Sequence, residues 1–162
     1  MRGFAYFAAA AAACVLAACS SPANVAGNYT VDLTDEANGC NLSNFTQGQS
    51  TSGVSVSITQ KDSDVTVAVT GVAGAYLMTV LGSSTFDGSV SGDGFDAKLI
   101  GTTAGHSSNC TFTFDADLHG DLAKDSISGT IDYTPQTNGS PDCSTIMGCT
   151  STQNFSGTRP PQ

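Results

Sequence analysis

Residues 16–19 read Leu-Ala-Ala-Cys, which places a reactive thiol directly after two small residues near the start of the chain. Arg2 and the amino terminus precede an apolar run over residues 4–15. That run is too short to cross a bilayer, which takes about 20 apolar residues, so it is typical of a signal-peptide core. A peptidase could bind the small residues in extended form, and we expect residues 1–18 to be a signal peptide.

The order of these residues resembles the lipobox of bacterial lipoproteins. The resemblance implies that the Cys19 thiol is alkylated with diacylglycerol, that the preceding peptide is removed, and that the new amine is acylated. In that family, an Asp directly after the lipidated Cys favours retention in the inner membrane. Here Ser20 follows Cys19, and by analogy this indicates the outer membrane. We therefore expect a cell-envelope protein whose membrane contact is the lipid on Cys19.

Four further cysteines follow in the exported part of the chain: Cys40, Cys110, Cys143 and Cys149. An even number of cysteines in an exported chain predicts two disulfides, which four cysteines can form in three ways. A zinc site is the alternative, but no C-x-x-C spacing is present and export favours oxidation. We predict no metal and no other cofactor.

Few other residues offer catalytic chemistry. His106 and His119 are the only histidines, and no G-x-S-x-G motif accompanies them, so a nucleophilic triad is not predicted. Asp115, Asp117 and His119 alternate along one strand and have the side chains of a divalent-ion site, but such a face is more often solvated surface. We predict that the protein is not an enzyme.

Period-2 alternation of apolar and polar residues runs through the chain and predicts an all-β fold. β-branched residues and Gly-rich turns are frequent, and no long helical period is present. One apolar face per strand indicates an antiparallel sheet with a single interior. We expect eight strands, closed as a small up-and-down barrel by pairing of the first and last. The expected strands are 28–34, 53–60, 64–71, 84–91, 94–101, 109–118, 126–134 and 152–158.

Residues 75–81 are apolar without alternation and could form a ninth strand or a helical turn. A ninth strand would move Cys110 to the barrel end opposite Cys40, whereas disulfide partners need Cα atoms within about 7 Å. We therefore expect a helical turn or folded loop at 75–81, with all four cysteines at one barrel end. The predicted pairs are Cys40–Cys110 and a local Cys143–Cys149 bridge.

Tyr29 and Arg159 have inward parity on the first and last strands, at the barrel end opposite the cysteines. A Gly-x-aromatic motif (Gly27, Asn28, Tyr29) with a basic residue after the last strand resembles the calycin pattern of lipocalins and their relatives. The resemblance implies that Tyr29 packs under Arg159 and closes the barrel floor. Tyr replaces the usual Trp, and the other lipocalin motifs are absent.

Length indicates one domain: a tether at 19–26, a barrel at 27–159 and a tail at 160–162. After removal of the signal peptide, four basic residues face fourteen acidic ones, which excludes binding to nucleic acid and electrostatic docking on anionic lipid. We expect a non-catalytic binding or accessory module whose partner is a small apolar ligand or an envelope protein. The alternatives are a protein inhibitor of an envelope lysozyme or protease, acting through the loops at 35–52 and 135–151, and a purely structural surface lipoprotein.

Overall fold

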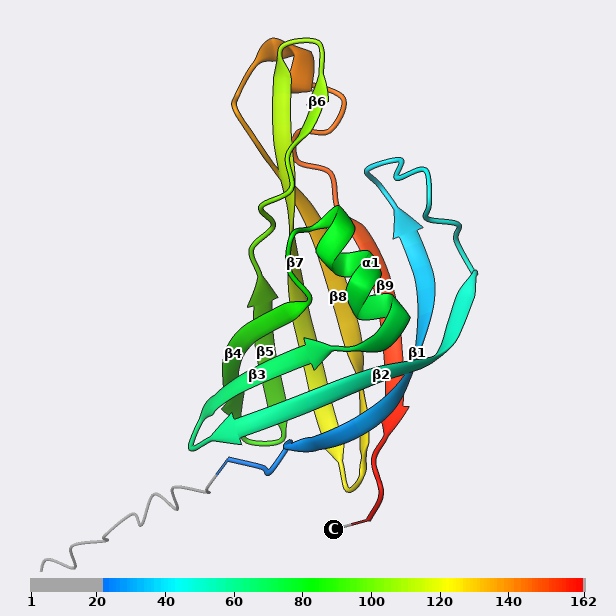
Figure 1. Ribbon diagram of the computed structural model, residues 1–162, viewed down its shortest axis with the longest axis vertical. Helices are drawn as coiled ribbons and strands as arrows, with labels where there is room; N and C mark the ends of the chain where they lie inside the picture. Colours follow the sequence, from blue (N-terminus) through cyan, green and yellow to red (C-terminus); the bar gives the residue numbers. More distant parts are fainter. Residues whose placement is uncertain (1–21, 162) are drawn as a thin grey trace, which may run out of the picture.

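A computed structural model describes residues 22–161 and shows nine strands, one α-helix and one 3-10 helix in that range (Figure 1). The mostly-β content confirms the predicted fold class. In chain order the elements are β1 (Gly27–Asn38), β2 (Ser50–Lys61), β3 (Asp64–Val69), α1 (Gly71–Val80), β4 (Thr85–Ser91), β5 (Gly94–Leu99), β6 (Gly105–Ser107), β7 (Cys110–Ala123), β8 (Ser126–Thr137), η1 (Pro141–Cys143) and β9 (Ser151–Thr158).

Eight of the described strands form a closed antiparallel barrel in the order β5-β4-β3-β2-β1-β9-β8-β7. β5 pairs with β7 and closes the ring, and the first strand, β1, pairs with the last, β9. The short strand β6 pairs with the start of β7 and lies outside the ring. The prediction of an eight-stranded barrel closed by its first and last strands is therefore confirmed.

The barrel interior is filled by the inward rows that the alternation predicts. Along β7, for example, Ala116 and Leu118 are buried, whereas Asp117 and His119 point outward. Phe86, Phe95 and Leu99 are each at most 2 % exposed and occupy the centre. The remaining members of the core are Val25, Tyr29, Val31, Val54, Val56, Ile58, Val65, Val67, Leu81, Val90, Ala97, Ile127, Ile131 and Phe155.

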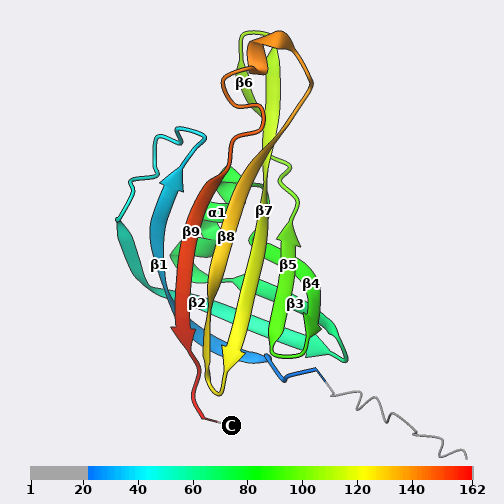
Figure 2. The ribbon, with the colours of Figure 1, turned by 180° about the vertical axis from the view of Figure 1, so that it is seen from behind.

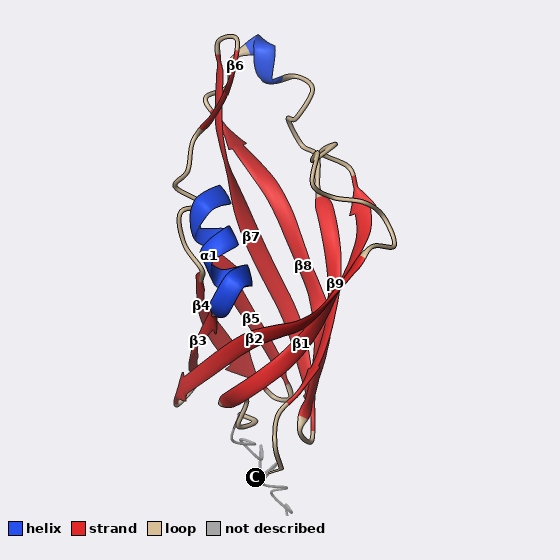
Figure 3. Cartoon of the chain, turned by 45° about the vertical axis from the view of Figure 1, so that its right-hand side comes forward, coloured by secondary structure: helices blue, strands red, loops and turns tan. Residues whose placement is uncertain are grey.

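The apolar run that lacks alternation forms α1, which confirms the expected helical turn but begins earlier, at Gly71. Gly74 allows the helix to approach the end of β3 closely, because a Cβ at this position would lie 2.3 Å from the Val69 carbonyl oxygen. Ala73 and Leu77 pack against the core from above, and Leu81 after the helix is buried. α1 therefore lies at the barrel mouth, above β2 and the shorter strands β3 and β4 (Figure 3).

The two barrel ends differ, and we call them the floor and the rim. The floor carries the β2–β3, β4–β5 and β7–β8 turns and the C-terminal residues, and residues 22–26 cross it (Figure 2). Ala23 donates its backbone N–H to the Gly92 carbonyl at 2.9 Å, and Val25 donates to Gln60 Oε1 at 2.8 Å. The rim carries α1, β6 and the connections 39–49 and 138–150.

Candidate functional site

Two disulfides clamp the rim, and their pairing differs from our prediction. Cys40 is bonded to Cys149 and Cys110 to Cys143, with Cα atoms 5.0 Å apart in each pair. The four cysteines do share one barrel end, but the predicted Cys40–Cys110 and Cys143–Cys149 pairs are wrong. Each observed bridge instead joins the ends of two neighbouring strands: Cys40 follows β1 and Cys149 precedes β9, whereas Cys110 begins β7 and Cys143 follows β8.

A network around η1 holds the β8–β9 connection against the start of β7. The Asp142 carboxylate accepts hydrogen bonds from the backbone N–H and the side-chain amide of Asn109, at 3.0 and 2.8 Å. These bonds hold the pKa of Asp142 below its usual value, because they favour the charged carboxylate. η1 is thereby fixed beside Cys110, and this turns Cys143 toward β7 and away from Cys149.

Residues 144–148 therefore form a short loop that is tied at both ends by disulfides. Cys143, before the loop, is bonded to Cys110, and Cys149, after it, is bonded to Cys40. Met147, at 56 % exposure, projects its side chain from this loop into solvent. Tying both ends reduces the conformational freedom that a loop loses when it binds a partner.

The β1–β2 connection is also ordered by its own contacts. The Asn38 side chain donates to the Leu42 and Phe45 carbonyls at 2.9 and 3.0 Å and accepts from the Leu42 N–H at 2.8 Å. Phe45 is buried and meets Tyr133 edge-on, with ring centroids 6.5 Å apart. This aromatic contact packs Phe45 against β8.

Below Phe45 lies a polar layer that the sequence analysis missed. The Tyr133 hydroxyl donates to Gln153 Oε1 at 2.7 Å, and Gln153 Nε2 donates to Asp35 Oδ1 at 2.6 Å. Asp35 Oδ2 accepts the Thr46 N–H at 2.9 Å, which ties the layer to the β1–β2 connection. Burial and then the Asp35 charge raise the pKa of Tyr133 above its usual value, so its hydroxyl remains a donor.

Every buried side-chain nitrogen and oxygen of the described residues, including those of this layer, has a hydrogen-bond partner. One sequence signal could have found it: Asp35 has the inward parity of Val31 and Leu33 on the same strand. An acidic side chain on an inward row requires polar partners inside the barrel.

The rim surface carries almost no charge. The connection 39–49, α1 and the segment 100–109 contain no Asp, Glu, Lys or Arg, and the connection 138–150 contains only Asp142. The acidic residues lie mainly on the barrel wall and the floor turns, for example Asp62, Asp93 and Asp125. A partner that contacts the rim therefore meets an uncharged surface of Ser, Thr, Asn and apolar side chains.

At the floor, the structure brings Tyr29 and Arg159 together. The Arg159 guanidinium carbon lies 5.6 Å from the centre of the Tyr29 ring, and Arg159 is 8 % exposed. Its Nη1 donates to the carbonyls of Asn24, at 3.0 Å, and Ala26, while Nε faces Asp125 at 3.4 Å. A Cβ at Gly27 would lie 2.8 Å from Arg159 Cδ, so glycine is required for this approach.

The outward residues weighed for metal or catalytic chemistry are engaged with other groups. Lys98 lies 3.3 Å from the Asp115 carboxylate and 3.1 Å from that of Asp117, and hydrogen bonding to Asp117 is the main reason that the pKa of Lys98 is raised. His119 Nδ1 lies 2.6 Å from Asp96 Oδ1 across the β5–β7 pair. Among residues 22–161, no group of three or more His, Cys, Asp or Glu side chains is placed to hold a metal ion.

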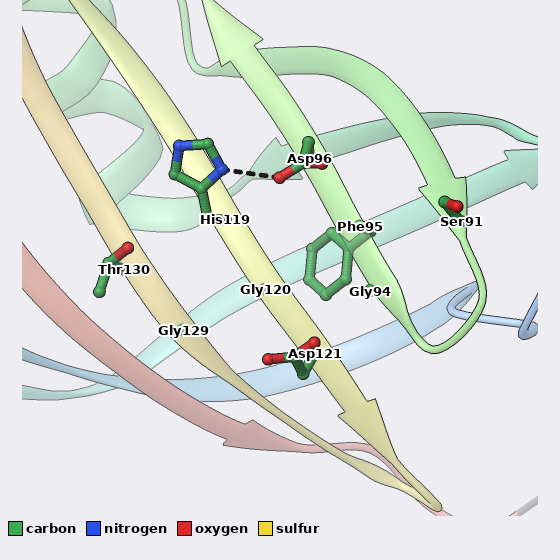
Figure 4. A pocket seen from close by; sticks show the side chains of 9 residues that line it. All are labelled: Ser91, Gly94, Phe95, Asp96, His119, Gly120, Asp121, Gly129 and Thr130. Atoms are coloured by element: carbon green, nitrogen blue, oxygen red, sulfur yellow. Dashed lines mark hydrogen bonds and ion pairs between the residues drawn. The ribbon is translucent and has the colours of Figure 1, made fainter.

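His119 and Asp96 border an open hollow of about 410 Å³ on the outer wall (Figure 4). The hollow is lined in part by the backbone of Gly120 and Gly129, which face each other on β7 and β8. A second open hollow, of about 570 Å³, lies at the floor beside Gln60 and Asp62. Both hollows lie outside the filled barrel interior.

Comparisons with known proteins give no relative: no family model, no curated protein and no solved structure matches the chain. Within residues 22–161, no helix is long and apolar enough to cross a membrane. Cys19, the expected lipidation site, lies outside the described residues.

Proposed function

We propose that the protein is a lipid-anchored, non-catalytic binding module of a bacterial cell envelope, held in the outer membrane by Cys19. The supports are the signal-peptide features of residues 1–18 and the Leu-Ala-Ala-Cys sequence that ends at Cys19. The two disulfides support export as well, since disulfides persist in oxidising compartments.

The position of the tether orients such a module. Ala23 is already bonded to the floor, so the four residues from Ala23 back to Cys19 reach at most about 14 Å from this point. A lipid on Cys19 then brings the floor close to the bilayer. The rim, at the opposite end, points away from the membrane and is open to partners.

The observation that carries the proposal is the contrast between a filled interior and a rigid rim. Core side chains and the polar layer occupy the space in which a barrel of this size holds a small ligand. The rim connections, in contrast, are fixed by two disulfides and side-chain hydrogen bonds. This arrangement favours an envelope protein as the partner over a small apolar ligand.

One feature favours a second candidate function, inhibition of an envelope hydrolase. The loop 144–148 is short, tied at both ends and presents Met147 to solvent. A loop of this kind can enter a partner's cleft with little loss of conformational entropy. A lysozyme or a protease of the envelope is the class of partner that such a loop fits.

The test is to titrate purified lysozymes and envelope proteases onto the immobilised full chain while the activity of each enzyme is followed. We expect one hydrolase to bind, and we expect Met147→Asp to weaken that binding at least tenfold, because a charge then enters the uncharged contact. Ser128→Asp, on an exposed position of β8 far from the rim, is the matched control and should leave binding unchanged.

The activity readout separates the two candidates. Binding with loss of enzyme activity supports an inhibitor, whereas binding without loss supports an accessory module. If no hydrolase binds, or if Ser128→Asp weakens binding as much as Met147→Asp, the rim is not a hydrolase-binding surface.

A further inference from the structure

The outer face of α1 is apolar and uncovered in the described part of the chain. Val72 is 90 % exposed, Met78 53 %, Tyr76 48 % and Val80 38 %. A helix on the surface of a globular protein normally turns a polar face to water, yet α1 has no charged residue. Burial in the core does not account for these four residues, because Ala73 and Leu77 make the contacts with the barrel.

Two contacts hold this face in place. The Tyr76 hydroxyl accepts a hydrogen bond from the Asn44 amide, which ties the helix to the β1–β2 connection. At the other end, Thr102 donates its N–H to the Leu81 carbonyl at 2.7 Å. The exposed Ile100, two residues before Thr102, adds to the same uncharged region. We call Val72, Tyr76, Met78 and Val80 the α1 face.

We propose that the α1 face is the surface through which two copies of this chain associate. The whole chain carries a net charge of −9, so most contacts between two copies bring acidic residues together. The stretch 65–86, which contains α1, has no charged residue, and neither has 99–114 apart from His106. Two identical α1 faces can therefore meet about a twofold axis without like-charge repulsion, whereas a charged partner finds no complementary group there.

The position of α1 allows this contact for molecules in one membrane. The helix lies above β2, β3 and β4, on the side opposite the tall wall of β7, β8 and β9, so its outer face is directed sideways (Figures 1 and 3). A twofold axis perpendicular to the membrane brings two such faces together and keeps both floors toward the bilayer. This step rests on the proposed anchoring at Cys19.

The size of the α1 face predicts a weak dimer in dilute solution. A helix of ten residues is about 15 Å long, which gives a contact smaller than the roughly 1,200–2,000 Å² of a standard stable interface. Confinement of both partners raises their effective concentration without any new contact. We therefore expect association mainly in the membrane.

Cysteine cross-linking tests the contact, because identical positions near a twofold axis meet each other. Ala75 is exposed between Val72 and Thr79 on the helix, and Ala75→Cys places a thiol at the centre of the face. In membranes of cells that produce the full chain, oxidation with copper phenanthroline should convert most of the Ala75→Cys chains to a disulfide-linked dimer of twice the mass. Ser128→Cys, exposed on β8, is the matched control and should remain at the mass of one chain.

A second substitution tests the chemistry of the contact. Adding Val72→Asp to Ala75→Cys should reduce cross-linking at least fivefold, while thermal unfolding remains unchanged because Val72 makes few contacts at 90 % exposure. Repeating the oxidation on the Cys19→Ser chain at about 100 µM and above separates this interface from the anchor, and we expect cross-linking to rise with concentration. The proposal is wrong if Ala75→Cys remains monomeric in both settings, joins a different protein, or cross-links no better than Ser128→Cys.

Discussion

Removal of the Cys40–Cys149 disulfide in the double variant Cys40→Ala/Cys149→Ala is expected to reduce the free energy of unfolding by about 5 kcal/mol. The bridge spans 109 residues, and in the loop-entropy model the stabilisation grows with the length of chain enclosed. It also ties the end of β1 to the start of β9, where the barrel closes. Replacing both cysteines leaves neither partner of this bridge as an unpaired thiol that could exchange with the remaining bridge.

The matched variant is Cys110→Ala/Cys143→Ala, whose bridge spans 33 residues. The same model gives about 4 kcal/mol for this bridge, so the two double variants should differ by about 1 kcal/mol. Equilibrium unfolding in guanidinium chloride measures both values. If Cys110→Ala/Cys143→Ala loses more unfolding free energy than Cys40→Ala/Cys149→Ala, local packing around η1, and not the length of enclosed chain, decides which bridge stabilises more.

Arg159→Ala is expected to cost about 3 kcal/mol of unfolding free energy. The substitution leaves the carbonyls of Asn24 and Ala26 without this donor and removes the cation from the Tyr29 ring. A hydrogen bond from a charged donor contributes about 1.5–3 kcal/mol, and the cation–ring contact contributes about 0.5–2 kcal/mol.

Arg159→Lys separates charge from geometry in the same unfolding experiment. A lysine keeps the positive charge, but its single ammonium group cannot reproduce the fork that bonds Asn24, Ala26 and Asp125 together. We expect Arg159→Lys to retain less than half of the unfolding free energy that Arg159→Ala loses. Ordinary surface substitutions change the unfolding free energy by up to about 0.5 kcal/mol. If the unfolding free energy of Arg159→Ala lies within that range of the unmodified protein, the floor contact does not contribute to stability.

The barrel could be predicted because its physical cause is visible in the sequence. Rows such as Ala116 and Leu118 alternate with Asp117 and His119, and a period of two fixes which side of each strand is buried. The helix could be predicted only indirectly, since a short apolar run fits a strand or a helix. The expectation that Cys40 and Cys110 share one barrel end decided between them, and the even strand count that closure requires agreed with it.

The disulfide pairing was predicted wrongly because distance along the chain was given more weight than neighbouring strands. Closure of the barrel places β9 beside β1, so Cys149, two residues before β9, must lie near Cys40, two residues after β1. The β7–β8 pair brings Cys110 and Cys143 together by the same rule. The local Cys143–Cys149 bridge does not form because the bonds between Asp142 and Asn109 turn η1 toward β7.

The polar layer and the α1 face could not be derived from alternation alone. Gln153 and Tyr133 have inward parity, but their partnership with Asp35 depends on the register between β1, β9 and β8. For α1, an almost uniformly apolar sequence does not show which side is exposed. That depends on the close contact of Gly74 with β3, which turns Ala73 and Leu77 toward the core.

The central claim, a module anchored in the envelope through Cys19, is tested most directly by the mass of the amino-terminal peptide of the mature protein. We predict a chain that begins at Cys19 and carries diacylglycerol on the thiol and an acyl group on the amine. Cys19→Ser should leave an unprocessed or soluble chain, because lipidation requires the thiol. A mature chain that begins at another residue, or a Cys19 that retains its free thiol, would contradict the account.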